Sequence, residues 1–478
     1  MTDLSASAYI QLIIAGICAI VAFLGSYLGL ARTILFILVA TIPFDLISSR
    51  YGSLNVGIIY LLGASVYLNR RIPRSRHNDY RAIWFGVGVL VFAYALAFLW
   101  NQKPITMLKA TYLIGLGSNV AMFYLVSVFV KTEEDVHAFF KALLVCNILV
   151  LGYCCLQILA EFTRIVPFGI QEFAFTKNRM TGAEGANRRL MGPFLGPGIL
   201  AEFFVLVTYV LLYYRLTTKR FPRLIPLVVF GNMCALIATG NRGGFLVLIA
   251  GFFLFALVFK KMVPFRTVMV IGVLGLLFLG GASYITYKYT TFNVLYGRLA
   301  ETEVSGAVPD TRKGWPEYIE EVTNVSPVFG TGVRLLLLGD IVDERTGKMK
   351  SNAPLDKVRG YPHSLYIYVY FTMGVVGLVA YAIFYLILVG YVRRPRYDYP
   401  DDPLMSNMHR LALFVLAVFA VDQFKIEFLR HSYVDYQNFI TALVSFFLAA
   451  RNIPPRGSRS PGTAGDETAP LDTSRSIP

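Results

Sequence analysis

Charged side chains are scarce in this sequence of 478 residues. Only 15% of the residues are Asp, Glu, Lys or Arg, whereas 56% are hydrophobic. One water-soluble core cannot bury that share of apolar side chains, so the composition excludes an ordinary soluble domain. The formal net charge of +15 would suggest nucleic-acid binding in a soluble protein. In a membrane protein the positive-inside bias explains it, and no nucleic-acid partner is expected.

Motifs of several common enzyme classes are also missing. The five cysteines lie inside apolar runs, without the spacing of zinc or redox sites. There is no H-E-x-x-H and no histidine pair at helical spacing, so no metal site is predicted. Asp340 and Asp343 fit a solvated loop better than a pair of metal ligands. No P-loop or dinucleotide fingerprint follows a strand, and the first apolar run lacks the flanks of a signal sequence.

Long apolar runs are what the sequence has in place of charge. A helix of roughly 20 apolar residues crosses the hydrocarbon of a bilayer, and such runs recur along the chain. They predict an all-α, polytopic membrane bundle of about 12–14 transmembrane helices. The predicted spans lie near residues 9–28, 32–48, 54–69, 82–100, 107–130, 139–162, 194–214, 224–239, 243–259, 267–287, 363–392, 411–424 and 436–450.

Four basic segments predict which face of the membrane is cytoplasmic. They fall on one side if the spans alternate, and the positive-inside rule makes that side the cytoplasm. The loop at residues 131–135 is predicted to lie on the same side. In this loop, Thr132 with Asp135 resembles a helix capping box. The basic segments are residues 70–81, 215–223, 260–266 and 393–396.

The same topology divides the chain into four parts. Residues 1–287 are predicted to form an N-terminal transmembrane bundle. Residues 288–362 form a large outer segment, predicted to be helical because structureless loops of this length are uncommon. Residues 363–450 add the C-terminal transmembrane helices. The tail at residues 451–478 is rich in Pro, Ser, Gly and Thr, and it is predicted to be disordered in the cytoplasm.

Two arginines on the predicted outer face are candidates for a functional site. Arg242 lies in a break between two spans, where Gly240 and Gly243 allow close backbone approach. Arg312 lies in the outer segment, close to Trp315. Taken alone, Arg242 is explained at least as well by a hairpin turn with an interfacial arginine, and Arg312 by a solvated loop charge.

Arg189 and His363 complete this outer-face group. Arg189 directly precedes a predicted span, where an interfacial anchor is the simpler explanation. His363 follows Tyr361 by two residues, at the outer end of a span. A lone histidine at a helix start is more often structural than catalytic, but sharing a face with three arginines favours a functional site. Charges inside spans, such as Glu202 and Asp422, further suggest a polar cavity that opens to this face.

Four motifs in this order resemble those of the bacterial O-antigen ligase and polymerase superfamily of membrane glycosyltransferases. The resemblance is clearest over residues 180–395. Asn241 replaces the commoner serine and Ser364 the commoner asparagine, but neither change removes an arginine or the histidine. The motifs are Arg189–Phe194 with Gly196-Pro197, Thr239–Gly244, the run from Arg312 through Trp315 to Ser326–Gly332, and Pro362–Tyr366 with the glycine-rich Met373–Leu378.

This resemblance implies a GT-C-like fold in the bacterial inner membrane, with a periplasmic active site. It implies an inverting, metal-independent transfer that needs no cofactor. The donor would be a glycan on undecaprenyl diphosphate, drawn from among the membrane lipids. The acceptor would be a lipid A-core sugar hydroxyl for a ligase of lipopolysaccharide biosynthesis, or a lipid-linked repeat unit for an O-antigen or exopolysaccharide polymerase.

The single histidine with an arginine pair favours the ligase among these alternatives. A transporter of lipid-linked sugars is a further alternative. It is disfavoured because the two halves of the sequence show no repeat and because a large outer segment precedes His363.

The chemistry of the four residues suits such a transfer. Arginine stays protonated and binds phosphate oxygens in a planar fork, so Arg242 and Arg312 are assigned to the diphosphate, with Arg189 as a third. A neutral imidazole suits a general base, so His363 is predicted to take the proton of the acceptor hydroxyl. The predicted supporting residues are Gly240, Gly243, Tyr361 and Trp315.

Overall fold

In the part of the chain that a computed structural model describes, the regular elements are helices, apart from one short antiparallel bridge. In this bridge Ser48 pairs with Ser53 and Ser49 with Gly52. The all-α prediction is therefore confirmed. The structure describes residues 16, 20–44, 48–49, 52–69, 80–100, 107–163, 189–194, 196–262, 275, 277, 280–281, 283–285, 288, 315–332, 364–424, 429 and 434–455.

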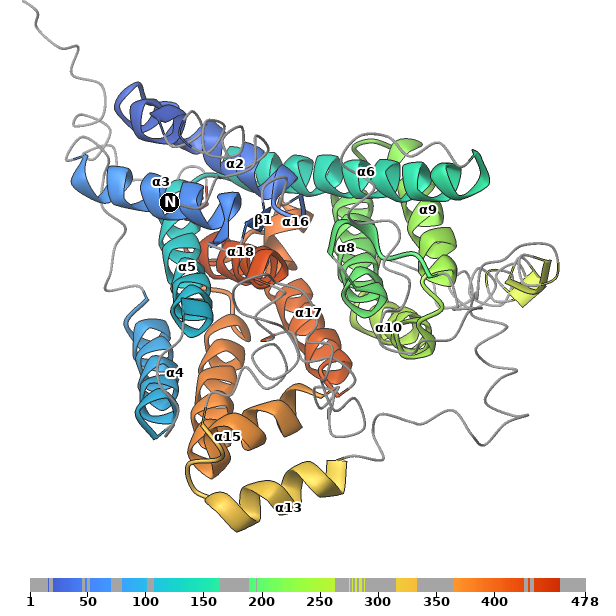
Figure 1. The fold of residues 1–478 in the computed structure, drawn as a ribbon. Coiled ribbons are helices and arrows are strands. Elements are labelled where there is room, and N and C mark those ends of the chain that lie inside the picture. The colour runs from blue at the N-terminus through green and yellow to red at the C-terminus, as the bar shows by residue number, and fades with distance from the viewer. Residues whose placement is uncertain are drawn as a thin grey trace, which may run out of the picture.

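The helices follow the apolar runs closely (Figure 1). Their bounds are α2 (Ala31–Thr41), α3 (Leu54–Leu68), α4 (Arg81–Trp100), α5 (Met107–Phe129), α6 (Glu133–Thr163), η2 (Gly192–Phe194), α8 (Pro197–Thr218), α9 (Leu224–Ala238), α10 (Arg242–Val258), α13 (Trp315–Val325), α15 (Leu365–Val392), α16 (Pro403–Ser406), α17 (Met408–Asp422) and α18 (Val434–Ala450); the two strands are β1 (Ser48–Ser49) and β2 (Gly52–Ser53).

Several of these helices suit a membrane by length and composition. Among the described residues, four helices are long and apolar enough to cross it: α4, most of α6, α8 and α15. Shorter apolar helices accompany them, namely α2, α3, Leu113–Phe129 of α5, α9, α10 and α18. The prediction of a polytopic membrane bundle is thus confirmed. Most of the span expected at residues 267–287 and part of the one at 9–28 lie outside the described residues.

The basic loops that the structure describes lie at one end of the helices, as the alternating topology requires. His137 Nδ1 lies 3.1 Å from Tyr214 Oη, and the Arg451 guanidinium lies 4.1 Å from the centre of the Tyr391 ring. The first contact joins the start of α6 to the end of α8, and the second joins the end of α15 to the residue after α18. We call this end the basic-loop face; among the described residues it comprises 131–137, 214–223, 391–404 and 451–453.

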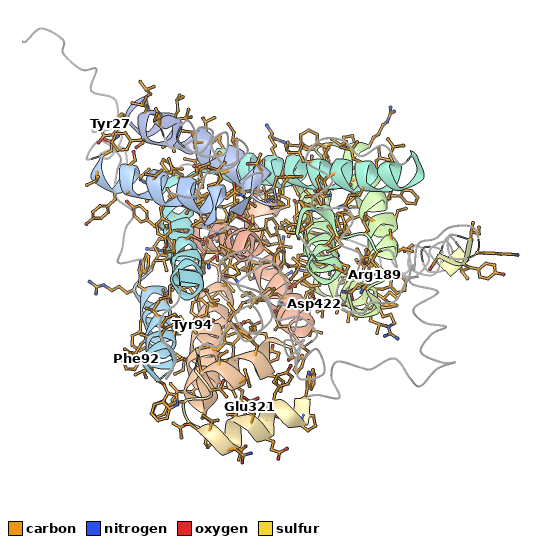
Figure 2. All side chains as sticks on the ribbon, in the orientation of Figure 1. Tyr27, Phe92, Tyr94, Arg189, Glu321 and Asp422 are labelled. Carbon is orange, nitrogen blue, oxygen red and sulfur yellow. The ribbon has the colours of Figure 1, made fainter. Side chains whose placement is uncertain are left out.

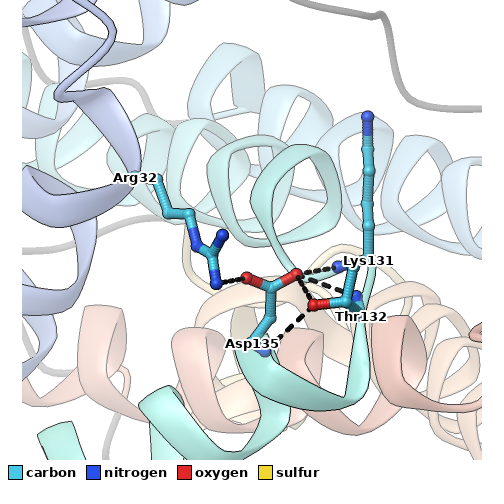
Figure 3. A network of polar contacts seen from close by, with 4 residues as sticks. All are labelled: Arg32, Lys131, Thr132 and Asp135. Atoms are coloured by element: carbon cyan, nitrogen blue, oxygen red, sulfur yellow. Dashed lines mark hydrogen bonds and ion pairs between the residues drawn. The ribbon is translucent and has the colours of Figure 1, made fainter. Parts of the chain in front are cut away.

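A carboxylate on the basic-loop face fixes the start of α6 (Figure 3). Thr132 N donates to Asp135 Oδ2 at 2.8 Å, and Asp135 N donates to Thr132 Oγ1 at 3.2 Å. This reciprocal pair is the predicted capping box. Asp135 also forms an ion pair with Arg32 at the start of α2, so the cap of one helix fastens a second helix to it.

The opposite end of the bundle carries the predicted outer-face motifs. Helix α8 lies at the centre of one half and contacts α6, α9, α10 and α17. Its aromatic side chains Tyr209, Tyr213 and Tyr214 are buried. Helices α4 and α15 pack along each other in the other half, and α13 packs on α15 (Figure 1).

Helix α15 is bent into two arms, and the break lies at Gly374 (Figure 1). This residue has φ 62° and ψ −154°, which no helix contains. The second arm, Val375–Val392, is about 27 Å long at 1.5 Å per residue. That length nearly matches the hydrocarbon thickness of a bilayer, so the second arm is long enough to form most of a span without the first.

Candidate functional site

The turn between α9 and α10 contains Arg242 and has a defined hydrogen-bonded geometry. Helix α9 is followed by Thr239 and then by Gly240, whose φ of 59° is left-handed. Glycine adopts this conformation at little cost, which explains its place at the end of the helix. Asn241 Oδ1 accepts a hydrogen bond from Gly244 N at 2.8 Å. Asn241 is thus the N-cap of α10, and Arg242 is the first residue of that helix.

The last carbonyls of α9 would be unpaired in an isolated helix, but here they have donors. Thr239 Oγ1 donates to Leu236 O at 2.6 Å, and Gly240 N donates to Ile237 O at 2.9 Å. The next two carbonyls are reached by a different part of the chain. Leu190 N donates to Ala238 O at 3.1 Å, and Arg189 Nε donates to Thr239 O at 2.7 Å.

This pairing brings two of the predicted motifs into direct contact. Arg189 and Thr239 are 50 positions apart in the sequence, yet the segment at residues 189–194 completes the turn that holds Arg242. Figure 2 shows Arg189 beside α10 at this end of the bundle. One nitrogen of the Arg189 guanidinium is therefore committed to the protein backbone.

The same segment is fastened on its other side to the end of α6. Gly192 N donates to Gln157 Oε1 at 3.0 Å, and Gln157 is buried. The Phe194 ring, which closes η2, lies 5.6 Å from the Tyr436 ring of α18. The Arg189–Phe194 motif is thus held between α6, α9 and α18.

Helices α8, α15 and α17 meet close to the Arg189–Phe194 motif. Gln423 Nε2, at the end of α17, donates to Glu202 Oε1 of α8 at 2.6 Å. The main-chain oxygen of Gln423 accepts a hydrogen bond from Leu365 N at 2.9 Å. Tyr366 Oη donates to Ala420 O at 2.8 Å. The start of α15 is therefore docked on the end of α17, which is in turn held by α8.

Helix α13 contributes the predicted supporting residue Trp315 at its first position. The indole Nε1 is buried and has no hydrogen-bond partner among the described residues. Tyr318, one turn later, packs with its ring centre 5.3 Å from that of Phe371 in the first arm of α15. A buried donor at the start of this helix is able to bind an oxygen of a substrate.

The Pro-x-x-Gly-x-Gly stretch after α13 docks into the break in α15. Val375 N donates to Pro327 O at 3.0 Å, and Val376 N donates to Val328 O at 3.1 Å. In return, Thr331 N donates to the Phe371 carbonyl oxygen at 2.9 Å. The backbone groups that the break releases are satisfied by the outer segment. We call residues 326–332 the docking loop.

Glycine is required on both sides of this contact. A Cβ atom at Gly330 would lie 2.6 Å from Gly374 N, and one at Gly374 would lie 2.4 Å from Val328 O. Both glycines also have left-handed φ values, 70° and 62°. Two motifs of the predicted superfamily are therefore complementary halves of one close contact.

The structure describes some of the predicted site residues and not others. Arg189, Arg242, Gly240 and Gly243 lie in or against one turn, and Trp315 begins α13. Tyr361, His363 and Arg312 lie outside the described residues. In the part of the chain that the structure describes, no three His, Cys, Asp or Glu side chains gather as metal ligands would; metal-independent transfer remains a prediction.

Two glutamines that hold the site together were not predicted. Gln157 and Gln423 are uncharged residues within or at the end of apolar runs, and nothing in their spacing distinguishes them. Glu202 and Asp422 did give a signal, because a charge inside a span normally faces a partner or a cavity. Both are buried, and Figure 2 shows Asp422 at the end of α17.

A comparison with known proteins finds a family match. Residues 225–382 match the family model described as O-antigen ligase. The match spans α9, the Arg242 turn, α10, α13 and most of α15. No curated protein matches the chain. Residues 225–382 are thus similar to the O-antigen ligase family, and this match supports the O-antigen ligase superfamily for this multi-pass membrane protein.

Proposed function

We propose that the chain is an O-antigen ligase-type glycosyltransferase of the bacterial inner membrane. Its family supports a glycosyltransferase of the ligase or polymerase type in general. In the specific proposal, a glycan moves from undecaprenyl diphosphate to a sugar hydroxyl of lipid A-core at the periplasmic face. The transfer inverts the anomeric configuration and uses no metal.

The observation that carries this proposal is the contact between the Arg189 segment and the Arg242 turn. It places an always-charged residue at the first position of α10, in a turn that hydrogen bonds from Arg189 and Gly244 hold in shape. The start of a helix favours anions because its N–H groups and its dipole face outward. A diphosphate suits this position because it is an anion and because its oxygens can accept hydrogen bonds from the arginine side chain.

The leaving group needs most of the electrostatic help. The bond between the anomeric carbon and the diphosphate oxygen breaks, and its electron pair stays on that oxygen. Arg242 and Arg312 would stabilise the growing negative charge. Because Arg189 Nε is bound to Thr239 O, Arg189 contributes by fixing the turn, and its remaining positive charge adds to the field.

The acceptor is activated at the start of α15. The sugar hydroxyl oxygen attacks the anomeric carbon while its proton passes to the imidazole of His363, and undecaprenyl diphosphate departs. Ser364, the next residue, is buried and precedes the first turn of α15. The hydrogen bond from Leu365 N to Gln423 O gives this helix start a fixed place for a base.

Purified protein with lipid-linked donor and lipid A-core acceptor tests the proposal. We expect a glycosidic product with and without a chelator such as EDTA. His363→Ala should lower the transfer rate by about 10²–10⁴-fold, and Arg242→Ala or Arg312→Ala by about 10²–10³-fold. The exposed Arg223, on the basic-loop face, gives a matched control, since Arg223→Ala should transfer normally. Full activity of His363→Ala, or of both site arginine variants, would exclude these roles.

The polymerase is the alternative within the same family. It shares the donor and the chemistry, and differs in accepting a second lipid-linked repeat. Cells that lack a ligase accumulate lipid-linked polymer beside bare lipid A-core, whereas cells that lack a polymerase attach single repeats. Deletion of the gene, followed by analysis of the lipopolysaccharide, distinguishes the two. A transporter would yield no glycosidic product in the purified assay.

A further inference from the structure

Glu202 is a carboxylate in an apolar helix, and its side chain has no exposed surface. A charge inside a span is costly, so such residues are normally matched by polar partners. Here Gln423 Nε2 donates a hydrogen bond to Glu202 Oε1 at 2.6 Å. The two residues are 221 positions apart in the sequence. Gln423 is itself completely buried. The pair thus joins α8 to the end of α17.

Gln423 has a second contact that leads to the candidate site. Its main-chain oxygen accepts the hydrogen bond of Leu365 N, which is the first residue of α15. Tyr366 Oη reinforces this contact through Ala420 O. Glu202 therefore contacts Gln423, and Gln423 in turn anchors the start of α15, which follows His363 in the sequence.

A second buried polar network shows what a purely structural network looks like in this bundle. Asn147 Nδ2 donates to Asn232 Oδ1 at 2.9 Å, and Asn232 Nδ2 donates to Thr208 Oγ1 at 3.0 Å. This network joins α6, α9 and α8, and no hydrogen bond of these side chains reaches a described residue of α15 or α17. All three residues are buried to the same degree as Glu202. The two networks differ in what they touch and not in burial.

We propose that Glu202 and Gln423 are positioning residues of the transferase, which hold the start of α15 so that the base that precedes it meets the acceptor hydroxyl. The proposal rests on the function proposed above. Glu202 does not touch the reacting atoms. It acts through the Gln423 amide, and Gln423 acts through its backbone oxygen.

Kinetics of matched variants test this role. Glu202→Leu and Gln423→Met remove the side-chain hydrogen bond, and each should lower kcat about 10- to 100-fold, with little change in the KM of the donor. Glu202→Gln keeps an acceptor for Gln423 Nε2, and it should retain kcat within about threefold. The control Asn147→Leu should lower thermal stability but leave kcat per folded molecule unchanged. A Glu202→Leu variant with normal kcat, or one no more impaired than Asn147→Leu, would overturn the proposal.

A labelling experiment separates this proposal from the proposed function. Ser364 is only 1% exposed, so a cysteine placed there in a cysteine-free background should react slowly with a maleimide. In the Glu202→Leu background it should react at least tenfold faster, whatever the activity. Unchanged labelling would reject the positioning role even if transfer were confirmed. Faster labelling together with a fully active His363→Ala variant would instead reject the base, and with it the proposed mechanism, while the anchoring stands.

Discussion

At the scale of single residues, the Arg242 turn shows what Asn241 does at a position where the resemblance leads us to expect serine. Asn241 stands where serine is commoner, and its side-chain oxygen accepts a hydrogen bond from Gly244 N. Serine and asparagine are both strong N-cap residues because each places an oxygen within reach of these amides. The residue type changes while the cap, and with it the place of Arg242, is kept.

Substitutions at Asn241 should therefore separate into two classes. Asn241→Ser keeps an N-cap acceptor, and its stability and transfer activity should match those of the wild type. Asn241→Ala loses it, which should cost about 0.5–2 kcal/mol of stability and reduce transfer. Thermal unfolding in detergent together with the transfer assay measures both effects. An alanine variant that is as stable and active as the serine variant would contradict the capping role.

Arg189 offers a test of hydrogen-bond geometry against charge. Lysine keeps the positive charge but lacks the Nε–H that binds Thr239 O at 2.7 Å. We expect Arg189→Lys and Arg189→Ala to lower the rate of transfer by similar factors, of about tenfold or more. If the lysine variant keeps full activity, charge alone is what the site needs from this position.

The sequence singles out charged residues as candidates for the site, but it does not single out the residues that hold them in place. Charges are rare in this chain, so Arg189, Arg242 and Glu202 stand out from the apolar background. Gln157 and Gln423 do not, because a neutral amide inside an apolar run has no periodicity or charge to mark it. Their partners are 35 and 221 positions away, and only the folded chain brings them together.

At the scale of the helices, the break in α15 explains why two glycine motifs occur together. The docking loop supplies the carbonyl oxygens that Val375 N and Val376 N would otherwise lack. Apolar runs predicted a single span at residues 363–392, and helix α15 fills this range. The break was not predicted, because glycines within a span are common and their φ cannot be read from composition.

A methyl group at the docking loop should loosen the outer segment. Gly330→Ala would place a Cβ atom 2.6 Å from Gly374 N at a left-handed φ of 70°, so the loop must shift. At Gly390, in the second arm of the same helix, an added Cβ atom would meet nothing within 4 Å, and Gly390→Ala is the matched control.

We expect Gly330→Ala to raise the rate of proteolysis in the outer segment several-fold and to reduce transfer. Gly390→Ala should be neutral or slightly stabilising, because alanine favours a helix over glycine by about 1 kcal/mol. Limited proteolysis in detergent, with mass spectrometry of the fragments, reports the first effect. Equal fragment patterns for both variants would show that the docking loop is not a fixed contact.

At the scale of the whole molecule, the described basic loops and the motifs of the candidate site lie at different ends of the helices. The basic loops gather at one end, held by contacts such as that of Arg451 with Tyr391. The motifs of the candidate site gather at the other. Alternation of the spans was enough to predict this separation, because each apolar run reverses the direction of the chain. Alternation does not predict the positions of α13 and the docking loop, because these depend on specific contacts with α15.

Cysteine labelling in intact spheroplasts tests the orientation of the bundle. Cysteine at Ser305, in the predicted outer segment, should react with a membrane-impermeant reagent added outside. Cysteine at the exposed Asp401, on the basic-loop face, should react only after permeabilisation. The native cysteines are replaced first. The reverse pattern would place the basic-loop face outside and would reject a periplasmic site.

The docking loop also has a consequence for the order of biosynthesis. Residues 326–332 leave the ribosome before α15 does, so one half of the contact has already been synthesised when the second half arrives. Val375 N and Val376 N have no helical partners at the break, and apolar surroundings offer them none. Insertion of the second arm and capture of the loop should thus be one event. A chain cut between α13 and α15 should not rebuild this span from its C-terminal piece alone.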